Sequence, residues 1–505
     1  MIPILDSRAM RAADAGAIRR GAAAEDLMEN AAEALCRDIE AALPGARRIA
    51  VVCGPGKNGG DGLAAARILA LHGHAPAVFT LRDPALYSGE SATNAERARG
   101  VGIAIRALSE SGGHAALRRA LGESDAVVDA LFGTGLSRAL EGAARRAVAA
   151  VNAAGRRVVA ADLPSGLSAD SGELLGAAVR AWRTVAFAAP KLCHVLPPAS
   201  GLCGEVSVAD IGIPRRMLAR GARRLWQTEA ADVARRLPTR PLDSHKGDFG
   251  RLAILAGSPG KPGAAVLAAR GGLRAGAGLV TVFAPASAAP SIVANLPEAM
   301  IEPLEEAAPR TLSGFDAAVV GPGLGTAAET VDVLEEIVRT ARIPLIADAD
   351  ALNAFAGRPS FFARRRAPTV LTPHPGEAGR LLRRSSRAVQ ADRLGAVRAL
   401  ARASRAVVVL KGAHSLIGTP DGEVVVNPTG TPLLATAGSG DVLSGVIGAL
   451  LAGGLAARDA AVAGAWLHGA AAEALETVLG DAGLLAHEVA DAIPRARLAL
   501  RGGAP

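Results

Sequence analysis

Residues 436–445 read TAGSGDVLSG and run directly into the apolar stretch VIGALLAGGL at 446–455. Serine and aspartate cap the free N–H groups of a first helical turn, and glycine tolerates the entry conformation, so the pattern predicts that a helix begins here. Glycines also let backbone N–H groups converge on an anion, which the helix dipole favours. An ordinary capped helix and a phosphate-binding helix start are equally compatible with the pattern. Asp441 stands beside the possible anion hole, where a carboxylate could take a proton.

Length and composition indicate a globular protein of two or three domains. The chain has 505 residues, of which 50% are hydrophobic and 21% charged, so it can bury large cores and is not a disordered chain. Its four cysteines are widely spaced without a C-x-x-C pair, which argues against a disulfide scaffold or a zinc site. The N-terminal stretch has no uninterrupted apolar core followed by a cleavage site. We therefore expect a cytoplasmic protein that has no membrane partner.

The net charge of +8 raises the question of nucleic-acid binding, but the arginines are scattered and the chain has only one tyrosine and three tryptophans. Aromatic platforms for stacking bases are therefore scarce, and we expect no nucleic-acid partner. Only five of the 56 basic residues are lysines, each in or next to a loop that contains glycine or proline. At such positions a compact, titratable ammonium is expected to matter. The five are Lys57, Lys191, Lys246, Lys261 and Lys411.

The whole chain shows an α/β pattern. Short β-branched runs such as RRIAVVCGPG and AVVVLKGAHS alternate with alanine-rich helical stretches, which indicates mainly parallel sheets buried on both faces. Residues 213–241 break this rhythm with charged residues and prolines, so we expect a domain junction near residue 220. Nearly every run ends in glycine and a polar residue. Ligands of open α/β sheets bind outside the carboxyl ends of the strands, and we expect the chemistry there.

Four predicted strands of the first half end in suggestive sequences. GPGKNGGDG (54–62) follows the first strand and precedes a helical stretch, which suits a loop of backbone donors for phosphate. It matches neither the standard dinucleotide fingerprint nor a P-loop. The other ends are DALFGTGL at 129–136, ADLPSGL at 161–167 and APK at 189–191.

If these strands lie side by side, Asn58, Asp129 and Ser165 offer hard oxygen ligands for a cation. Asp162 and Lys191 then form a candidate acid/base pair. The structural alternatives are Asx-turns for the two aspartates and a surface amine for the lysine.

The ordered motifs carry a resemblance to a known pair of families. GPGKNGGDG, DALFGTGL and DLPSG followed by Lys191 resemble the NAD(P)H-hydrate epimerase family, as do the opening residues MRAADAGAIRRGAAAEDLMENAA. The second half resembles the ADP-dependent NAD(P)H-hydrate dehydratases of the ribokinase-like superfamily. The stretches that carry the second likeness are HKGDFGRLAILAGS, GAAVLAARGGLRAGAGLVTV, GPGLG, DADALN, LTPHPGEAGRLL, LKGAHSLI and ATAGSGDVLSG.

This resemblance implies two three-layer α/β domains. Residues 1–218 would form a Rossmann-like epimerase domain and residues 224–505 a ribokinase-like dehydratase domain. The implied activity is repair of hydrated NADH and NADPH: the R and S hydrates are interconverted, and the S form is dehydrated at the expense of ADP, giving AMP and phosphate. The resemblance also implies K⁺ in the first domain, Mg²⁺ in the second, and a homo-oligomer.

In the first domain the resemblance implies that Asp162 contacts the substrate and that Lys191 works with it in proton transfer. Asn58, Asp129 and Ser165 match the positions that bind potassium in the family. Lys57 stands where the family usually has asparagine, which alters the expected hydrogen bonds of that loop. The residues implied to hold the hydrate are Lys57, Asn58, Gly59, Gly60, Asp61, Gly133, Thr134, Gly135, Leu136 and Asp162.

In the second domain the resemblance implies that Asp441 deprotonates the hydroxyl that is phosphorylated. His374 either contacts the hydrate or is an ordinary buried histidine, and the carboxylates of DADALN (348–353) either take part in magnesium binding or cap a helix. Ala437 and Thr431 depart from the usual glycine and asparagine. The residues implied to contact the hydrate are Ala264, Gly323, His374 and Asp441, and those implied for the adenine nucleotide are Lys411, Gly412, Ala413, His414, Ser415, Gly438, Ser439 and Gly440.

Two other functions are compatible with parts of the pattern. The second domain could be a true kinase of a hydroxylated metabolite, since the same GSGD sequence would serve. The first domain could be a binding or scaffold module without activity, although the joint presence of Asn58, Asp129, Asp162 and Lys191 argues against this.

Overall fold

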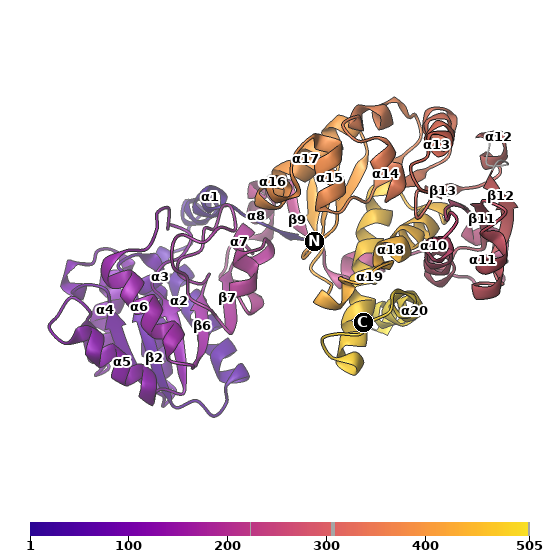
Figure 1. The fold of residues 1–505 in the computed structure, drawn as a ribbon. Helices are drawn as coiled ribbons and strands as arrows, with labels where there is room; N and C mark the ends of the chain where they lie inside the picture. The colour runs from indigo at the N-terminus through magenta and orange to yellow at the C-terminus, as the bar shows by residue number, and fades with distance from the viewer. Residues whose placement is uncertain (223, 305–308, 503–505) are drawn as a thin grey trace. The chain divides into compact units, whose positions relative to one another are not determined.

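The computed structural model describes residues 1–222, 224–304 and 309–502, and the chain divides into two compact units (Figure 1). One unit comprises Ile2–Arg223, and the other comprises Arg224–Pro505 together with Met1. Each has its own sheet and its own core, and the two are described separately below. None of the helices in the described ranges combines the length and apolarity that a membrane span needs.

The sheet of the first unit has the order β4-β3-β2-β5-β6-β7-β8, and all its pairs are parallel. The strand order reverses between β2 and β5, because β3 continues from β2 on one side and β6 from β5 on the other. Such a switch point opens a crevice at the carboxyl ends of the two strands. The strands are β2 (Arg48–Cys53), β3 (Ala75–Thr80), β4 (Ile105–Ala107), β5 (Ala126–Ala130), β6 (Arg157–Ala161), β7 (Arg183–Phe187) and β8 (Glu205–Ala209).

Helices cover both faces of this sheet, as alternate side chains of β2 show. Val52 packs in a core cluster with α5 and α6, whereas Val51 on the other face lies against Gly62 of α3. A three-layer arrangement follows. After the short β1 (Ile2–Pro3) the helices are α1 (Ser7–Ile18), α2 (Ala24–Ala42), α3 (Lys57–Leu71), α4 (Glu90–Gly100), α5 (Gly113–Glu123), α6 (Gly142–Ala153), α7 (Leu192–Val195) and α8 (Arg215–Gly221).

The sheet of the second unit has the order β9-β18-β17-β16-β15-β14-β13-β10-β11-β12. Its pairs are parallel except at β17, which runs antiparallel to β16 and β18. The strands are β9 (Leu225–Gln227), β10 (Arg251–Leu255), β11 (Leu279–Ala284), β12 (Met300–Pro303), β13 (Ala317–Val320), β14 (Leu345–Ala347), β15 (Thr369–Leu371), β16 (Val407–Leu410), β17 (Leu416–Gly418) and β18 (Val424–Val426).

The main core of this unit joins α10, α18, α19 and α20 to the sheet, while α17 packs against β16 and β17. The prediction of α/β units with mainly parallel sheets is confirmed. The helices are α9 (Ala230–Ala234), α10 (Pro262–Ala275), α11 (Ala289–Asn295), α12 (Pro309–Leu312), α13 (Ala328–Thr340), α14 (Asp350–Ala354), α15 (Pro375–Leu382), α16 (Ser386–Ala391), α17 (Arg393–Ser404), α18 (Ser439–Ala452), α19 (Ala457–Leu479) and α20 (Ala486–Gly502).

The helix predicted after TAGSGD is α18, and its glycines allow close packing. A Cβ at Gly445 would lie 1.9 Å from the carbonyl oxygen of Ala268, and one at Gly271 would lie 2.5 Å from that of Val442. Only glycine leaves room for α10 and α18 to approach this closely. The apolar run that follows the opening motif is therefore a buried helix held against its neighbour.

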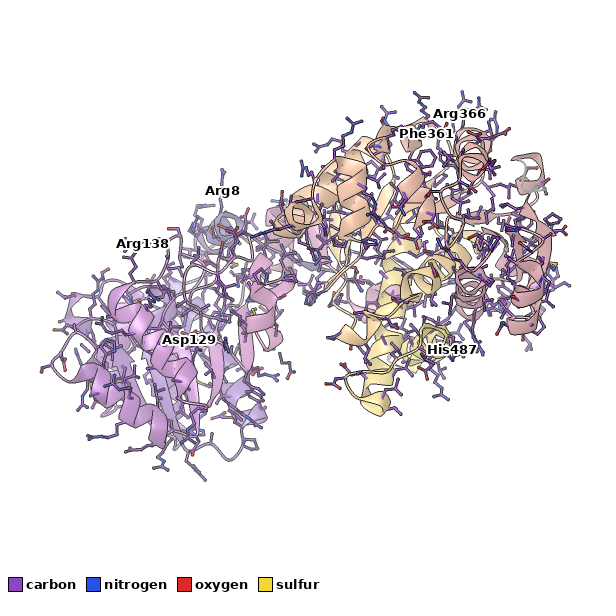
Figure 2. The ribbon with its side chains drawn as sticks, in the orientation of Figure 1. Arg8, Asp129, Arg138, Phe361, Arg366 and His487 are labelled. Atoms are coloured by element: carbon purple, nitrogen blue, oxygen red, sulfur yellow. The ribbon has the colours of Figure 1, made fainter. Side chains whose placement is uncertain are left out.

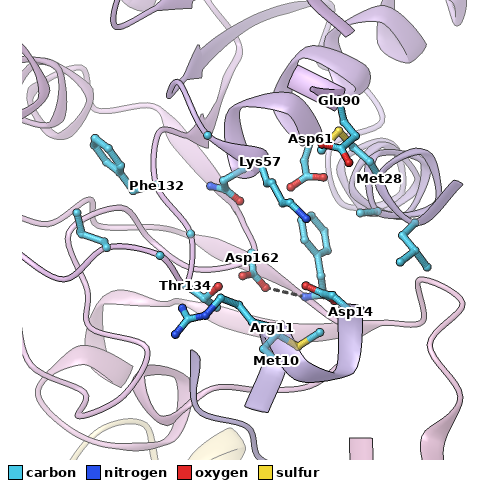
Figure 3. A pocket seen from close by; sticks show the side chains of 18 of the residues that line it. Met10, Arg11, Asp14, Met28, Lys57, Asp61, Glu90, Phe132, Thr134 and Asp162 are labelled. Carbon is cyan, nitrogen blue, oxygen red and sulfur yellow. Dashed lines mark hydrogen bonds between the residues drawn. The ribbon is translucent and has the colours of Figure 1, made fainter. Parts of the chain in front are cut away.

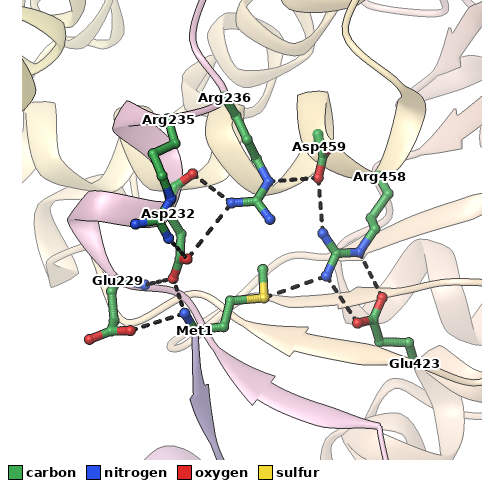
Figure 4. Close-up of polar contacts among 8 residues, drawn as sticks. All are labelled: Met1, Glu229, Asp232, Arg235, Arg236, Glu423, Arg458 and Asp459. Atoms are coloured by element: carbon green, nitrogen blue, oxygen red, sulfur yellow. Dashed lines mark hydrogen bonds and ion pairs between the residues drawn. The ribbon is translucent and has the colours of Figure 1, made fainter.

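A network of ion pairs borders α9 and the start of α19 (Figure 4). The buried carboxylate of Asp232 accepts from the ammonium of Met1 and, at 2.7 Å, from Arg235. Arg236, just after α9, donates to the carbonyl of Asp232 and to Asp459, and Arg458 pairs with Glu423 at 2.6 Å. The network fixes the first helix of the unit against α19.

Candidate active sites

A cavity of about 720 Å³ lies in the first unit, where the segments that follow β2 and β5 meet (Figure 3). Gly59 and Gly60, in the first turns of α3, are not among the residues that line it. The structure therefore gathers most of the predicted first-domain residues, from four separate strand ends, around one space. The predicted residues that line it are Lys57, Asn58, Asp61, Gly133, Thr134, Gly135, Leu136, Asp162 and Lys191.

The glycines of the 54–62 segment serve packing as well as access. A Cβ at Gly54 would lie 1.7 Å from the carbonyl oxygen of Leu131, and one at Gly59 would lie 1.8 Å from that of Gly54. The segments after β2 and β5 are thus pressed together, which lets α3 begin at the cavity wall. No side chain caps the first turn of α3, whose N-cap residue is Gly56, so its N–H groups suit an anion.

Asp162 and Lys191 form a buried ion pair at the cavity floor. The side chain of Lys191 is fully buried, and its Nζ donates to Oδ1 of Asp162 and, at 2.8 Å, to the carbonyl of Phe187. The same carboxylate oxygen accepts from the N–H of Phe187 at 3.1 Å. Asp162 has a φ of +67°, in the left-handed region. Strained backbone of this kind clusters at functional sites, which points to Asp162 as more than a turn residue.

Asp129 of β5, labelled in Figure 2, is fully buried and is bound by neutral donors. It accepts from the N–H and Oγ of Ser165, both at 2.7 Å, and from the N–H of Leu131 at 3.2 Å. Burial raises its pKa to about 6, against the effect of these hydrogen bonds. The amide Nδ2 of Asn58 is buried without a partner, and Gly133 approaches that side chain. The three predicted oxygen ligands, Asn58, Asp129 and Ser165, are therefore all close to the segment 131–133 that follows β5.

In the second unit, Asp441 lies in the first turn of α18. The N-cap Gly438 has a φ of +87° and no side chain caps this turn, although the N–H of Ser439 lies 3.5 Å from the carbonyl oxygen of Thr436. Burial raises the pKa of Asp441 to about 7; the charge of Asp348 adds to this effect and that of Lys411 opposes it. A carboxylate with this pKa is suited to accept a proton near neutral pH.

Lys411 lies between the DADALN motif and the GSGD turn. Its Nζ lies 2.9 Å from Oδ1 of Asp348 and 3.8 Å from Oε2 of Glu377. Oδ2 of Asp348 accepts from Oγ of Ser444 at 2.5 Å. A Cβ at Gly440 would lie 3.1 Å from Nζ of Lys411, so the lysine stands directly beside the GSGD turn.

His374 is the N-cap of α15, and its side chain is 50% exposed, so the buried-core alternative is wrong. Its Nδ1 accepts from the N–H of Gly376 at 3.0 Å, and Glu377 accepts from the N–H of His374 at 2.8 Å. Elsewhere in the unit, Gly323 and Ala264 are neighbours, since a Cβ on the glycine would lie 2.8 Å from that of Ala264. The imidazole of His374 is thus half exposed, and its Nε2 lies 3.3 Å from Oε1 of Glu377.

The loop 411–415 is shaped by a residue that the sequence analysis missed. The buried guanidinium of Arg393 donates to the carbonyls of Ala413 and, at 3.4 Å, of His414. His414 has a φ of +49°, and its Nδ1 is buried without a partner. Arginine dominates the basic residues of this chain, so no sequence signal singled Arg393 out.

The carboxylates of DADALN are already engaged by the protein. Asp350 begins α14 and accepts from the N–H of Gly325 at 2.8 Å, with Nζ of Lys261 at 3.6 Å. Asp348 pairs with Lys411 as described above. Within the described ranges no cluster of three or more histidine, cysteine, aspartate or glutamate side chains is placed to hold a metal ion.

Further lining residues of the first cavity were not predicted. Those on α1 and α2 include Arg11, Asp14 and Met28, which Figure 3 shows beside Asp61 and Asp162. The likeness of the opening helices to the epimerase family pointed to this region but assigned no residue in it.

Comparison with known proteins defines the class of both units. A family model described as NAD(P)H-hydrate dehydratase matches residues 252–495, and one described as YjeF-related protein N-terminus matches residues 24–193. The fusion of these two domains defines a bifunctional architecture. The chain belongs to the family of bifunctional NAD(P)H-hydrate repair enzymes.

Relatives along nearly the whole chain support that membership. The bifunctional NAD(P)H-hydrate repair enzymes Nnr of Thermofilum pendens and Moorella thermoacetica are both 41% identical to it, over 95% and 93% of this chain and 93% and 91% of their own. The solved ADP/ATP-dependent NAD(P)H-hydrate dehydratase of Bacillus subtilis, co-crystallised with ATP/Mg²⁺, is 34% identical with a TM-score of 0.50. The match covers 55% of this chain and 98% of the Bacillus subtilis chain.

Proposed function

We propose that this chain repairs hydrated NADH and NADPH in two steps. Residues 1–218 interconvert the R and S hydrates, and residues 224–505 dehydrate the S form with ADP, releasing AMP, phosphate and the reduced cofactor. The observation that carries the proposal is the place of Asp441, a carboxylate with a pKa of about 7 at the uncapped start of α18. A base beside an anion site is what phosphorylation of a hydroxyl requires.

In the dehydratase step, Asp441 takes the proton of the C6 hydroxyl while the oxygen attacks the terminal phosphorus of ADP, and AMP leaves with the electrons of the broken P–O bond. The N–H groups of Gly438, Ser439 and Gly440 and the ammonium of Lys411 stabilise the charge on the transferred group. The phosphate then leaves C6 with the bonding electrons while the lone pair of the ring nitrogen forms N1=C6. A proton passes from C5 to water, its electron pair forms the C5=C6 double bond, and the N1=C6 pair returns to nitrogen. Ala264, Gly323 and His374 contact the hydrate, and residues 411–415 hold the adenine nucleotide.

Magnesium is proposed to enter with the nucleotide and to neutralise charge on its phosphates. The residues fit an ion held largely by phosphate and water, because Asp348 and Asp350 already bind Lys411 and the N–H of Gly325. Asp350 would contact the ion through its water shell.

In the epimerase step, we propose that the phosphates of the hydrate bind the first turn of α3 at Lys57 and the segment 133–136. Asp162 and Lys191 exchange protons with the hydrate. The site around Asp129 suits K⁺ held by Asn58, Asp129 and Ser165, since the buried carboxylate is bound only by neutral donors in the contacts described. Such an ion would compensate the buried negative charge.

The same proposal covers the setting of the enzyme. We infer small-molecule substrates only, without nucleic-acid or membrane partners, and a cytoplasmic homo-oligomer.

The test uses separated R and S hydrates of NADH, each incubated with the full chain with and without ADP and Mg²⁺. We expect the S hydrate to regain the near-ultraviolet absorbance of reduced nicotinamide only with ADP, and the R hydrate to do so by way of the S form. AMP and orthophosphate should appear in equal amounts. Release of a phosphorylated, still hydrated product would instead identify a kinase, and failure to convert either hydrate would refute the proposal.

A further inference from the structure

Asp14 is a carboxylate of the epimerase cavity to which no role has been assigned. It lies on α1, whose first residue is anchored over the site: the N–H and Oγ of Ser7 donate to Asp170, at 2.6 and 2.7 Å, in the segment that follows β6. Because of this anchor, α1 forms one wall of the cavity that Asp162 and Lys191 also line. Figure 3 shows Asp14 close to Asp162.

The charges around Asp14 differ from those around Asp162. Burial raises the pKa of Asp14; the ammoniums of Lys57 and Lys191 oppose this and the charge of Asp162 adds to it. Asp61, on the same cavity, has its pKa raised well above the usual range by burial and by its neighbours Asp162 and Asp14. In the contacts found among the described residues, Lys191 pairs with Asp162, whereas no hydrogen bond or ion pair engages the carboxyl of Asp14.

Two carboxyl groups in one cavity, one ion-paired and one free and half-buried, can divide acid and base roles between them. We propose that Asp14 is the proton donor of the epimerase cavity and that Asp162 is its partner base. The inference rests on the proposed function and adds a residue and a route to it.

The step balances as follows. The carboxylic acid of Asp14 gives its proton to the hydroxyl on C6, the C6–O bond breaks with its electrons on oxygen, and water leaves while the N1 lone pair forms an N1=C6 double bond. Water adds to either face of the planar C6, its electrons forming the new C6–O bond and the N1=C6 pair returning to N1. Asp162 takes the released proton. The proton then passes from Asp162 back to Asp14 through cavity water. Alternatively, the reverse reaction starts with Asp162 protonated and Asp14 ionised.

The principal test replaces Asp14 in the full chain by asparagine, which keeps the shape and removes the acid. We expect conversion of R to S hydrate to fall by about 10²- to 10⁴-fold, the usual contribution of a positioned acid or base. Dehydration of S hydrate with ADP should be unchanged in the same preparation. Asp26→Asn, at an exposed position on α2, is the matched control and should convert R hydrate at the wild-type rate.

A second measurement separates proton transfer from a structural role. Epimerisation in water enriched in oxygen-18 should place solvent oxygen on C6 of the product at the rate of epimerisation, above the exchange seen without enzyme. Asp14→Asn should lose label uptake and epimerisation together, without a fall in the melting temperature, because an amide of the same shape replaces a half-buried carboxylate that makes no pair in the contacts found.

Three results would overturn the inference: an undiminished rate in Asp14→Asn, a loss of activity that follows a loss of folding, or epimerisation without uptake of label. Failure of the proposed function has a different signature, because the wild-type chain would then leave R hydrate unconverted. The two failures are therefore distinguished by the wild-type arm.

Discussion

Nζ of Lys411 lies 2.9 Å from Oδ1 of Asp348, and this pair joins the strand end after β16 to the strand end after β14 directly beside the first turn of α18. Burial works against the charged lysine, but Asp348 and Glu377 more than offset it and raise the pKa of Lys411. The ammonium is thus kept charged next to the turn in which Asp441 lies. This arrangement supports both predicted roles, an anion site and a base, in one place.

Asp441→Asn tests the base. The amide cannot accept the hydroxyl proton, so we expect the rate of S-hydrate dehydration to fall by about 10²- to 10⁴-fold. Epimerisation by the first unit should continue. The measurement is recovery of reduced-nicotinamide absorbance from S hydrate at saturating ADP, beside the exposed control Asp481→Asn. Restoration of damaged cofactor at full speed by Asp441→Asn would remove Asp441 from the mechanism.

The pH dependence of dehydration follows from the same residue. Asp441 must be ionised to act, and its pKa is about 7, so the rate at saturating substrates should fall about tenfold per unit as the pH drops below about 7. We call this falling part of the pH–rate profile the acid limb; above it the rate should not change with pH. An acid limb centred at the ordinary pKa of aspartate would show that Asp441 does not govern the rate.

Neighbouring charges should move that limb in opposite directions. Glu377 raises the pKa of Asp441 and Lys411 lowers it. Glu377→Gln should therefore shift the limb to lower pH and Lys411→Met to higher pH, while Glu336→Gln, at an exposed position on α13, should leave it in place. Shifts in the same direction for both variants would contradict the electrostatic account.

The sequence was informative where chemistry and strand ends coincide. The start of α18 was predicted from TAGSGD because capping and helix-dipole rules act over a few neighbouring residues. The residues after β2 and β5 and Asp162 line one cavity, since parallel strands bring their carboxyl ends to the same edge. The roles of single residues came from the family resemblance and are tested by the variants above.

Other features depend on contacts between distant segments. Asp14 lines the cavity from α1, whose first residue, Ser7, is bonded to the distant Asp170. Arg393 of α17 stabilises the loop 411–415. In a chain so rich in arginine, no sequence pattern singles this residue out. His374 was open to two interpretations because its exposure is decided by how α15 meets the sheet.

Ser165→Ala tests the proposed potassium site. The change removes the hydrogen bond from Oγ to Asp129 and leaves the N–H of Phe132 without its acceptor, so we expect a loss of about 1–3 kcal/mol in the stability of the first unit. Urea unfolding followed by the fluorescence of Trp182, in a chain whose other tryptophans are replaced (Trp226→Phe, Trp466→Phe), measures it, with exposed Ser171→Ala as control. Potassium should stabilise the wild-type unit more than sodium does, and this difference should shrink in Ser165→Ala. Equal stabilisation by both ions in the wild type would argue against the site.

Gly59→Ala and Gly122→Ala form a matched pair that tests why the segment after β2 is rich in glycine. A Cβ at Gly59 would lie 1.8 Å from the carbonyl oxygen of Gly54, whereas one at Gly122 on α5 meets nothing within 4 Å. We expect Gly59→Ala to push α3 off the cavity wall, destabilise the first unit by about 3 kcal/mol and abolish epimerisation, because backbone gives way poorly. Gly122→Ala should instead add about 0.5–1 kcal/mol, since alanine favours a helix. Both should dehydrate S hydrate normally; full epimerisation by Gly59→Ala would show that the close approach is not needed for the site.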